Sequence, residues 1–302
     1  MANKYYTDYP EYLLRFFPAG KVQKISVNTD SGCPNRDGTI GTGGCIYCNN
    51  ASFTPGYCFE TRGVTAQIEA GKRVFARKYP EMQYIAYFQS YTNTHRNSVE
   101  RLERQYREAM ACPGVMGLSV ATRPDCLPDE VADLLVALNR EMPVFVELGI
   151  ETLRDDTLKL INRGHDSATA IDAIRRLAAR GLHVGVHLIA GLPGETLCTA
   201  LENVKAVCSE PVESIKLHHL QVLRSTPLHA MLERGELEVP RFSVDEYIDF
   251  CVNVIRSVPR TVAIERFLAS APPAMVVSPH WGLKNHEFQH LLLNRLNEIT
   301  KS

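Results

Sequence analysis

The sequence predicts an α/β fold in which a partial parallel βα barrel of about six strands carries N- and C-terminal extensions. Two observations support this prediction. From residue 24 onward, strand-like and helix-like segments alternate along the chain, which is the pattern of repeated βα units joined by right-handed crossovers. Most strand-like segments also have one apolar face and one small or polar face, whereas a parallel sheet covered by helices on both sides would be apolar on both faces.

The elements follow one another in a regular order. The expected strands span residues 24–30, 84–90, 115–123, 144–151, 183–190 and 214–220. Helical periodicity lies between them, at residues 62–79, 97–111, 128–140, 154–181 with a break at Gly164, and 195–208. After residue 240 we expect a helix, a further strand with a loop, and a closing helix, at 242–258, 261–270 and 285–299. The predicted units are an N-terminal extension, the barrel, and a C-terminal extension that caps it, at residues 1–23, 24–240 and 241–302.

The polar strand faces decide between a closed and an open barrel. In segment 144–151 one face carries valine, leucine and isoleucine, and the other carries Glu147 and Glu151. His187 occupies the polar face of its segment, as do Lys216 and His218 of theirs. A closed eight-stranded barrel fills its interior with bulky branched side chains. We therefore expect a wider, partly open TIM-like barrel that holds a polar ligand; the alternative is that these faces are exposed to solvent.

Composition and charge narrow the class of protein. The 302 residues are 45% hydrophobic and 22% charged with a net charge of −1, so no overall attraction to nucleic acid or anionic membranes is expected. The N-terminus lacks a signal-peptide pattern, and no uncharged apolar run approaches the ~20 residues that span a bilayer. Nine cysteines, an odd number, indicate thiols or metal ligands rather than disulfides. We expect a cytoplasmic protein without a membrane partner.

Three cysteines lie in the glycine-rich loop after the first expected strand. In SGCPNRDGTIGTGGCIYCNN, residues 31–50, Cys33, Cys45 and Cys48 have the spacing C-x11-C-x2-C. A C-x2-C pair occurs in zinc, redox and iron–sulfur sites alike. A structural zinc site usually has four ligands, and Cys58 or His95 would be the fourth. The loop alone leaves zinc and iron–sulfur open, whereas a polar interior above it favours a cluster that keeps one iron open for a ligand.

Six segments in one order resemble the radical S-adenosylmethionine (radical SAM) family. They are CPNRDGTIGTGGCIYCN, YFQSYTNT, TRPD, ELGIET, INRGHD and HLIAGLPGET, and they cover nearly the whole chain. The chain is similar to the YhcC-like group, whose relatives include the catalytic subunit of the elongator complex. The widespread spacing in the superfamily is C-x3-C-x2-C; the first gap of eleven residues resembles the elongator-related branch.

The resemblance implies a radical enzyme. Cys33, Cys45 and Cys48 would bind three irons of a [4Fe–4S] cluster, and the amino and carboxylate groups of S-adenosylmethionine would chelate the fourth. Reductive cleavage would give a 5′-deoxyadenosyl radical, with flavodoxin or ferredoxin as electron donor. The substrate is unknown: the elongator relationship suggests RNA, such as tRNA, and a small molecule or a protein is equally admissible. The rival interpretation is a non-enzymatic zinc or iron–sulfur protein with four protein ligands.

The resemblance also implies contacts to S-adenosylmethionine. Tyr47 lies where the family places an aromatic residue near the adenine. Gln89, Tyr91 and Thr92 replace the family's Gly-Gly-Glu element, which receives the methionine amine, and their polar groups can accept from an ammonium. Gly191 begins GLPGET, which resembles the element that contacts adenine.

The remaining candidates are charged. Arg163 in INRGHD matches an arginine that pairs with the methionine carboxylate, which a guanidinium binds bidentately. Glu147 or Glu151 would bind ribose hydroxyls or brace Arg163. Residues expected at the mouth or interior, as substrate contacts or proton donors, are Arg123, Asp125, His187, Lys216 and His218. Arg266 and Trp281 are further candidates on the substrate side.

Overall fold

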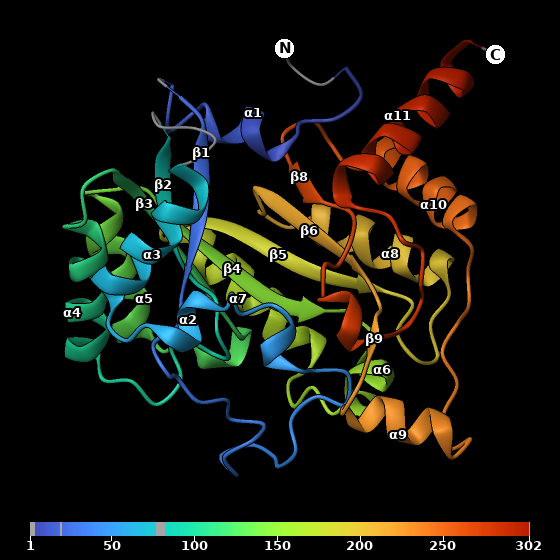
Figure 1. The fold of residues 1–302 in the computed structure, drawn as a ribbon, viewed down its shortest axis with the longest axis horizontal. Helices are drawn as coiled ribbons and strands as arrows, with labels where there is room; N and C mark the ends of the chain where they lie inside the picture. Colours follow the sequence, from blue (N-terminus) through green and yellow to red (C-terminus); the bar gives the residue numbers. More distant parts are fainter. Residues whose placement is uncertain (1–3, 19, 77–81, 302) are drawn as a thin grey trace.

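A curved sheet of seven parallel strands forms the centre of the molecule (Figure 1). The computed structural model describes residues 4–18, 20–76 and 82–301. In spatial order the strands are β1 (Val22–Val27), β2 (Gln83–Phe88), β3 (Val115–Thr122), β4 (Val144–Glu151), β5 (His183–Ala190), β6 (Ser214–His219) and β8 (Ala263–Arg266). Spatial order follows chain order, so each crossover leads to the neighbouring strand, as expected for repeated βα units.

Helices cover the outer face of the sheet (Figure 1). They are α3 (Val64–Ala76), α4 (Val99–Met110), α5 (Asp129–Asn139), α7 (Ser167–Ala179) and α8 (Leu197–Cys208). The short helix α6 (Asp155–Leu160) instead lies beyond the strand ends, where Leu158 shares a buried cluster with Ile46 of the cysteine loop. Strand residues such as Val146 and Val186 and helix residues such as Leu135 and Ile174 share one buried cluster. Burying each such side chain contributes roughly 1.5–3 kcal/mol. The apolar strand face therefore meets the helices, and the polar face is left for the interior.

The expected elements are present, with one difference in strand number. The expected helix at 154–181 is broken where Gly164 has a φ of 85°, between α6 and α7. Residues 77–79 of the expected helix at 62–79 lie outside the described residues. The further strand expected in 261–270 is β8, which pairs in parallel with β6 and brings the sheet to seven strands rather than about six. The division of the chain at residues 23/24 and 240/241 stays a prediction.

The N-terminal segment covers the open side of the half-barrel between its edge strands β1 and β8. Asp8 forms a parallel bridge with Ile264 of β8, and α1 (Tyr9–Leu13) contacts the same strand. Tyr12 and Phe145 belong to an aromatic cluster with neighbours from β2 and β8. This cluster closes the N-terminal end of the barrel, whereas loops border the opposite end, where the strands have their carboxyl ends.

The C-terminal part packs beside α8. Helices α10 (Val244–Ser257) and α11 (Asn285–Lys301) contact each other, and α10 also contacts α8. The smaller elements are the 3-10 helices at Asn50–Ser52, Pro124–Cys126 and Pro273–Met275, helices α2 (Tyr57–Glu60) and α9 (Pro227–Glu233), and the antiparallel strands β7 (Val222–Leu223) and β9 (Val276–Ser278). None of the described helices combines the length and the apolar character that crossing a bilayer requires.

Candidate functional site

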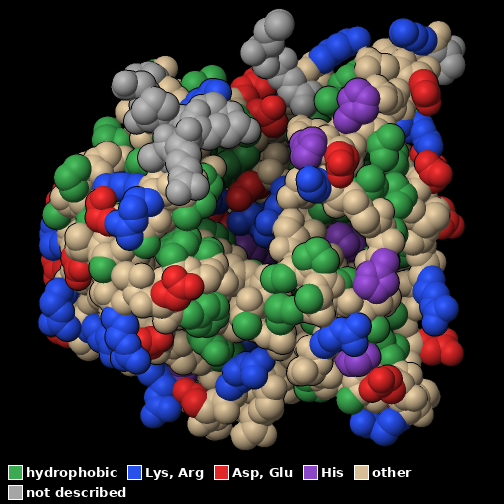
Figure 2. Space-filling view, in the orientation of Figure 1, with side chains coloured by type: hydrophobic (Ala, Val, Ile, Leu, Met, Phe, Trp, Pro, Cys, Tyr) green, Lys and Arg blue, Asp and Glu red, His purple; other side chains and the backbone are tan. Residues whose placement is uncertain are grey.

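One cavity joins the cysteine loop to the polar interior of the half-barrel. Its volume is about 650 Å³, and Figure 2 shows the hollow with acidic, basic and histidine side chains inside. At the carboxyl ends of the strands the cavity is lined by Cys33, Cys45 and Cys48. Nearer the middle of the strands it is lined by Lys216 and Glu147. Pockets of about 300–1,000 Å³ are typical of small-molecule and cofactor sites. The predicted metal loop and the predicted polar interior therefore open into the same space.

Hydrogen bonds fix the cysteine loop to the segment after β4. The Ile46 N–H donates to the Ile161 carbonyl at 3.0 Å, and the Asn162 side chain donates to the Gly44 carbonyl at 2.8 Å. Gly44 has a φ of 79°, and a Cβ there would meet the Arg36 guanidinium at 2.8 Å. A glycine is required at this position both by the backbone conformation and by the close approach of Arg36. The loop is thus anchored at the rim of the cavity.

The three thiols lie close enough to influence one another electrostatically. Burial, followed by the repulsion from Cys45, raises the pKa of the Cys48 thiol to about 11. The Arg163 Nη1 and the Asn35 Nδ2 each lie 3.6 Å from the Cys45 Sγ. Thiolates bind metals, and a bound cation would stabilise the ionised form that burial disfavours here. The donor set therefore fits a thiolate-bound metal centre.

Neither candidate for a fourth ligand lines the cavity among the described residues. The Cys58 thiol donates to the Ser26 carbonyl at 3.3 Å, and the His95 Nε2 lies 2.8 Å from the Asp37 Oδ2. Across residues 4–18, 20–76 and 82–301, no group of three or more histidine, cysteine, aspartate or glutamate side chains is arranged to hold a single metal ion. A four-iron cluster does not require such convergence, because each thiolate binds a different iron.

Arg163 lies between the cysteine loop and β4. Its Nη2 is 3.3 Å from the Glu151 Oε1 and donates to the Gly149 carbonyl. A Cβ at position 149 would meet that Nη2 at 2.9 Å, so the guanidinium occupies the space that the glycine leaves. The buried Nε of Arg163 is left without an acceptor among the described residues. Arg163 is therefore held beside Cys45 with one donor unused.

Glu147 is the centre of a buried charge network. Its carboxylate accepts hydrogen bonds from Lys24 at 2.5 Å, Lys216 at 2.6 Å, Ser119 at 2.6 Å, His187 at 2.7 Å and Tyr87 at 2.9 Å. Burial alone would raise the pKa of Glu147, but the charges of Lys216 and Lys24 hold that pKa well below its ordinary value. The carboxylate therefore remains ionised and links strands β1, β2, β3, β5 and β6 to β4.

Comparison with family models decides the class of protein. Residues 6–207, more than half of the chain, match the model of the radical SAM superfamily. The chain belongs to this superfamily. Residues 212–298 match the model of the radical SAM C-terminal domain.

Individual relatives agree with the family. The chain is 36% identical to the protein YtqA of Bacillus subtilis over 91% of its own length and 85% of YtqA. It is 37% identical to the protein YhcC of Escherichia coli over 86% of its own length and 82% of YhcC. A solved structure of Elp3 from the archaeon Methanocaldococcus infernus superposes with a TM-score of 0.68 at 19% identity. The match covers 93% of this chain but only 64% of the Elp3 chain, and at this identity it shows the radical SAM fold alone.

Most sequence-predicted residues line the cavity of this radical SAM fold. They are Cys33, Cys45, Tyr47, Cys48, Gln89, Tyr91, Thr92, Arg123, Glu147, Glu151, Arg163, His187, Lys216, His218 and Arg266. Asp125 lies behind the cavity wall and accepts from Arg123 at 2.9 and 2.8 Å, so it positions that guanidinium. Gly191 also lies outside the lining: its φ is 90°, and a Cβ there would meet the Phe242 ring at 2.9 Å. Packing in the turn after β5 explains this glycine.

The two glutamates of β4 have separate environments. Glu151, not Glu147, braces Arg163: its Oε1 lies 3.3 Å from the Arg163 Nη2. The five donors on Glu147 occupy both of its oxygens, so this carboxylate is committed to the network rather than free for a ribose.

Two charged residues of the interior, Lys24 and Glu265, were not predicted. Lys24 lies 2.9 Å from Glu265, and Lys216 lies 3.0 Å from the same carboxylate. Lys24 has the same strand parity as Ser26, whose side chain also lines the cavity, so the alternation of the first strand contained the signal. Trp281 stacks on His219 with ring centroids 4.4 Å apart, outside the lining among the described residues.

Proposed function

We propose that this protein is an enzyme that binds a [4Fe–4S] cluster through Cys33, Cys45 and Cys48 and uses it to cleave S-adenosylmethionine reductively. One observation supports the proposal most directly. The three thiols of the loop and the guanidinium of Arg163 face one cavity, and that cavity continues into a polar interior. A purely structural metal site would need neither the cavity nor the charged side chains beneath it.

The residues have distinct tasks in this proposal. Arg163 is placed to bind the methionine carboxylate, because its Nε lacks an acceptor while Glu151 and the Gly149 carbonyl hold its other end. Tyr47 lines the cavity beside Cys48 and would pack on the adenine. When bound, the reduced cluster would supply an electron to the sulfonium, and the resulting 5′-deoxyadenosyl radical would remove a hydrogen atom from the substrate. The protein holds these groups in place and excludes water.

The cellular partners belong to the same proposal. Flavodoxin or ferredoxin would supply the electron, and the reaction would take place in the cytoplasm. RNA, a small molecule and a protein are the candidate substrates. Binding that falls steeply with salt would favour RNA, because binding to its phosphates releases counterions.

An anaerobic assay tests the proposal. The chain is reconstituted with iron and sulfide and mixed with S-adenosylmethionine and dithionite, and 5′-deoxyadenosine is measured by chromatography. We expect product that is lost when Cys33, Cys45 and Cys48 are all changed to alanine. Cys58→Ser is the matched control, because its thiol bonds to the Ser26 carbonyl and should not be needed for the cluster. A protein that retains zinc, forms no cluster and gives no product would instead be the non-enzymatic metal protein.

A further inference from the structure

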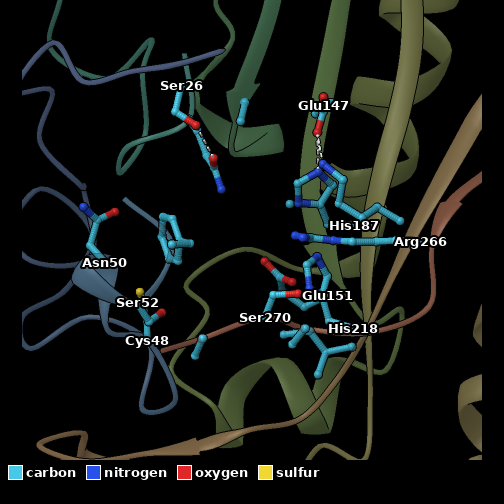
Figure 3. A pocket seen from close by; sticks show the side chains of 18 of the residues that line it. Ser26, Cys48, Asn50, Ser52, Glu147, Glu151, His187, His218, Arg266 and Ser270 are labelled. Atoms are coloured by element: carbon cyan, nitrogen blue, oxygen red, sulfur yellow. Dashed lines mark hydrogen bonds and ion pairs between the residues drawn. The ribbon is translucent and has the colours of Figure 1, made fainter. Parts of the chain in front are cut away.

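Arg266, the last residue of β8, projects into the cavity opposite the cysteine loop. Figure 3 shows its side chain between those of His187 and His218, facing the side that carries Cys48 and Asn50. Arg266 therefore lies across the cavity from the proposed cluster and faces the space that a substrate would have to occupy.

The Arg266 guanidinium is not neutralised. In the described part of the chain its side chain has neither a hydrogen bond nor an ion pair, and its buried Nε lacks an acceptor. Two other arginines of the wall have acidic partners: Arg123 binds Asp125 bidentately, and Arg163 pairs with Glu151. Each of these two also has one buried donor without an acceptor among the described residues, so what distinguishes Arg266 is that its charge has no acidic partner in the interior. A buried polar donor without an acceptor is costly, so this guanidinium is poised for an anion that comes from outside the chain.

The charges around the cavity do not balance without such an anion. Lys24 and Lys216 are matched by Glu147 and Glu265. Arg36 stands at the cysteine loop, where it donates to the Cys48 carbonyl. Among the described residues that line the interior of the cavity, the positive charge of Arg266 therefore has no acidic partner. This local excess of positive charge exists although the whole chain has a net charge of −1.

The neighbouring groups can donate hydrogen bonds without adding charge. Burial lowers the pKa of His218, so its ring is neutral at pH 7 and carries one N–H donor. His187 is also neutral, but its single N–H already donates to Glu147. The Gln221 Oε1 accepts from the Ala271 N–H at 3.1 Å, which leaves its NH2 group available. The Ser270 Oγ accepts from Asn285 at 2.9 Å, which leaves its hydroxyl hydrogen. Gln221 and Ser270 line the same cavity.

We propose that Arg266 binds a carboxylate or phosphate group of a small-molecule substrate, with neutral donors of the cavity wall completing the site. This inference rests on the proposed function, because it assigns the substrate class of that same cavity. A single unpaired guanidinium within a cavity suits one anionic group. A polyanion such as RNA would be bound by a row of surface cations, and a net charge of −1 gives no such field.

Calorimetric titration of the reconstituted full chain with inorganic phosphate and with acetate, at constant ionic strength, tests the inference. We expect at least one of the two anions to bind, and the preferred one identifies the substrate group. Arg266→Gln should weaken that binding by roughly tenfold to a hundredfold, as expected for a lost charge-assisted hydrogen bond. Arg266→Lys, which keeps the charge, should lose less. Arg107→Gln is the matched control, because Arg107 is exposed and bonds to Glu103 and Glu141.

The outcomes separate this inference from the proposed function. Near-ultraviolet circular dichroism confirms that each variant is folded, and 5′-deoxyadenosine is measured on the same preparations. Anion binding that depends on Arg266 in a protein without cleavage activity would support the anion site and contradict only the radical enzyme. Unchanged affinity in Arg266→Gln, no binding of either anion, or binding of an RNA oligonucleotide alone would overturn the inference.

Discussion

The charge network around Glu147 gives the most direct test of how the half-barrel is held together. We expect Glu147→Gln to destabilise the protein, because two buried lysines lose one of their two carboxylates. Removing one partner of a buried ion pair costs about 3–5 kcal/mol. Glu265 remains 2.9 Å from Lys24 and 3.0 Å from Lys216, so the loss should lie near the lower end, about 3 kcal/mol.

Equilibrium unfolding in urea measures this loss, and Glu141→Gln is its matched control. Glu141 pairs with Arg107 on the surface, with 49% of its side chain exposed, and such pairs contribute about 0–1 kcal/mol. Adding Lys216→Met to Glu147→Gln should restore part of the stability, because the second change removes a charge that the first left uncompensated. A Glu147→Gln variant as stable as Glu141→Gln, or a double variant with no recovery, would refute the reasoning.

Three further predictions concern the cysteine loop, the buried His219, and Gly149, which the Arg163 guanidinium approaches closely. Cys48→Ser should lose bound iron in a colorimetric assay, whereas Cys58→Ser should keep it. Burial lowers the pKa of His219 from 6.5 to about 4, so the unfolded state binds more protons between these values and stability rises with pH. Urea unfolding should therefore show that the free energy of unfolding falls when the pH is lowered from about 7 to 5. His219→Asn should make this fall smaller by about 2 kcal/mol, and replacing the exposed His290 should leave it unchanged. Gly149→Ala should weaken S-adenosylmethionine binding about tenfold by calorimetry, since its Cβ would displace a guanidinium donor.

Strand alternation explains how much of the site could be predicted from the sequence. Side chains of a strand alternate between two faces, so parity alone placed His187, Lys216 and His218 in the interior. Parity gives a face but not a partner, and the pairing of Lys24 with Glu147 and Glu265 depends on how the sheet curves. Glu147 and Glu151 share one parity, so the alternation also could not tell which of them pairs with Arg163.

Turns carried less information than strands, because a turn has no periodicity that separates cavity from packing. Asp125 comes three residues after β3 and Gly191 directly follows β5, both at the end of the sheet where parallel strands place ligands. One holds Arg123 and the other makes room for Phe242. A glycine that allows a close approach looks the same in sequence whether a ligand or a ring approaches it.

The network also explains why an open half-barrel can keep a polar interior. An interior without bulky apolar side chains loses the packing that fills closed barrels. Here one carboxylate reaches side chains from five neighbouring strands, through Lys24, Tyr87, Ser119, His187 and Lys216. Because Glu147 is fixed by these donors, it positions the strands instead of exchanging protons with a ligand. Among the described residues of the lining, three arginines keep an unused buried donor: Arg123, which Asp125 holds, Arg163 near the cysteines, and Arg266 opposite them. A loss of Glu147 should therefore disturb both ends of the cavity together, although Glu147 bonds to none of the three.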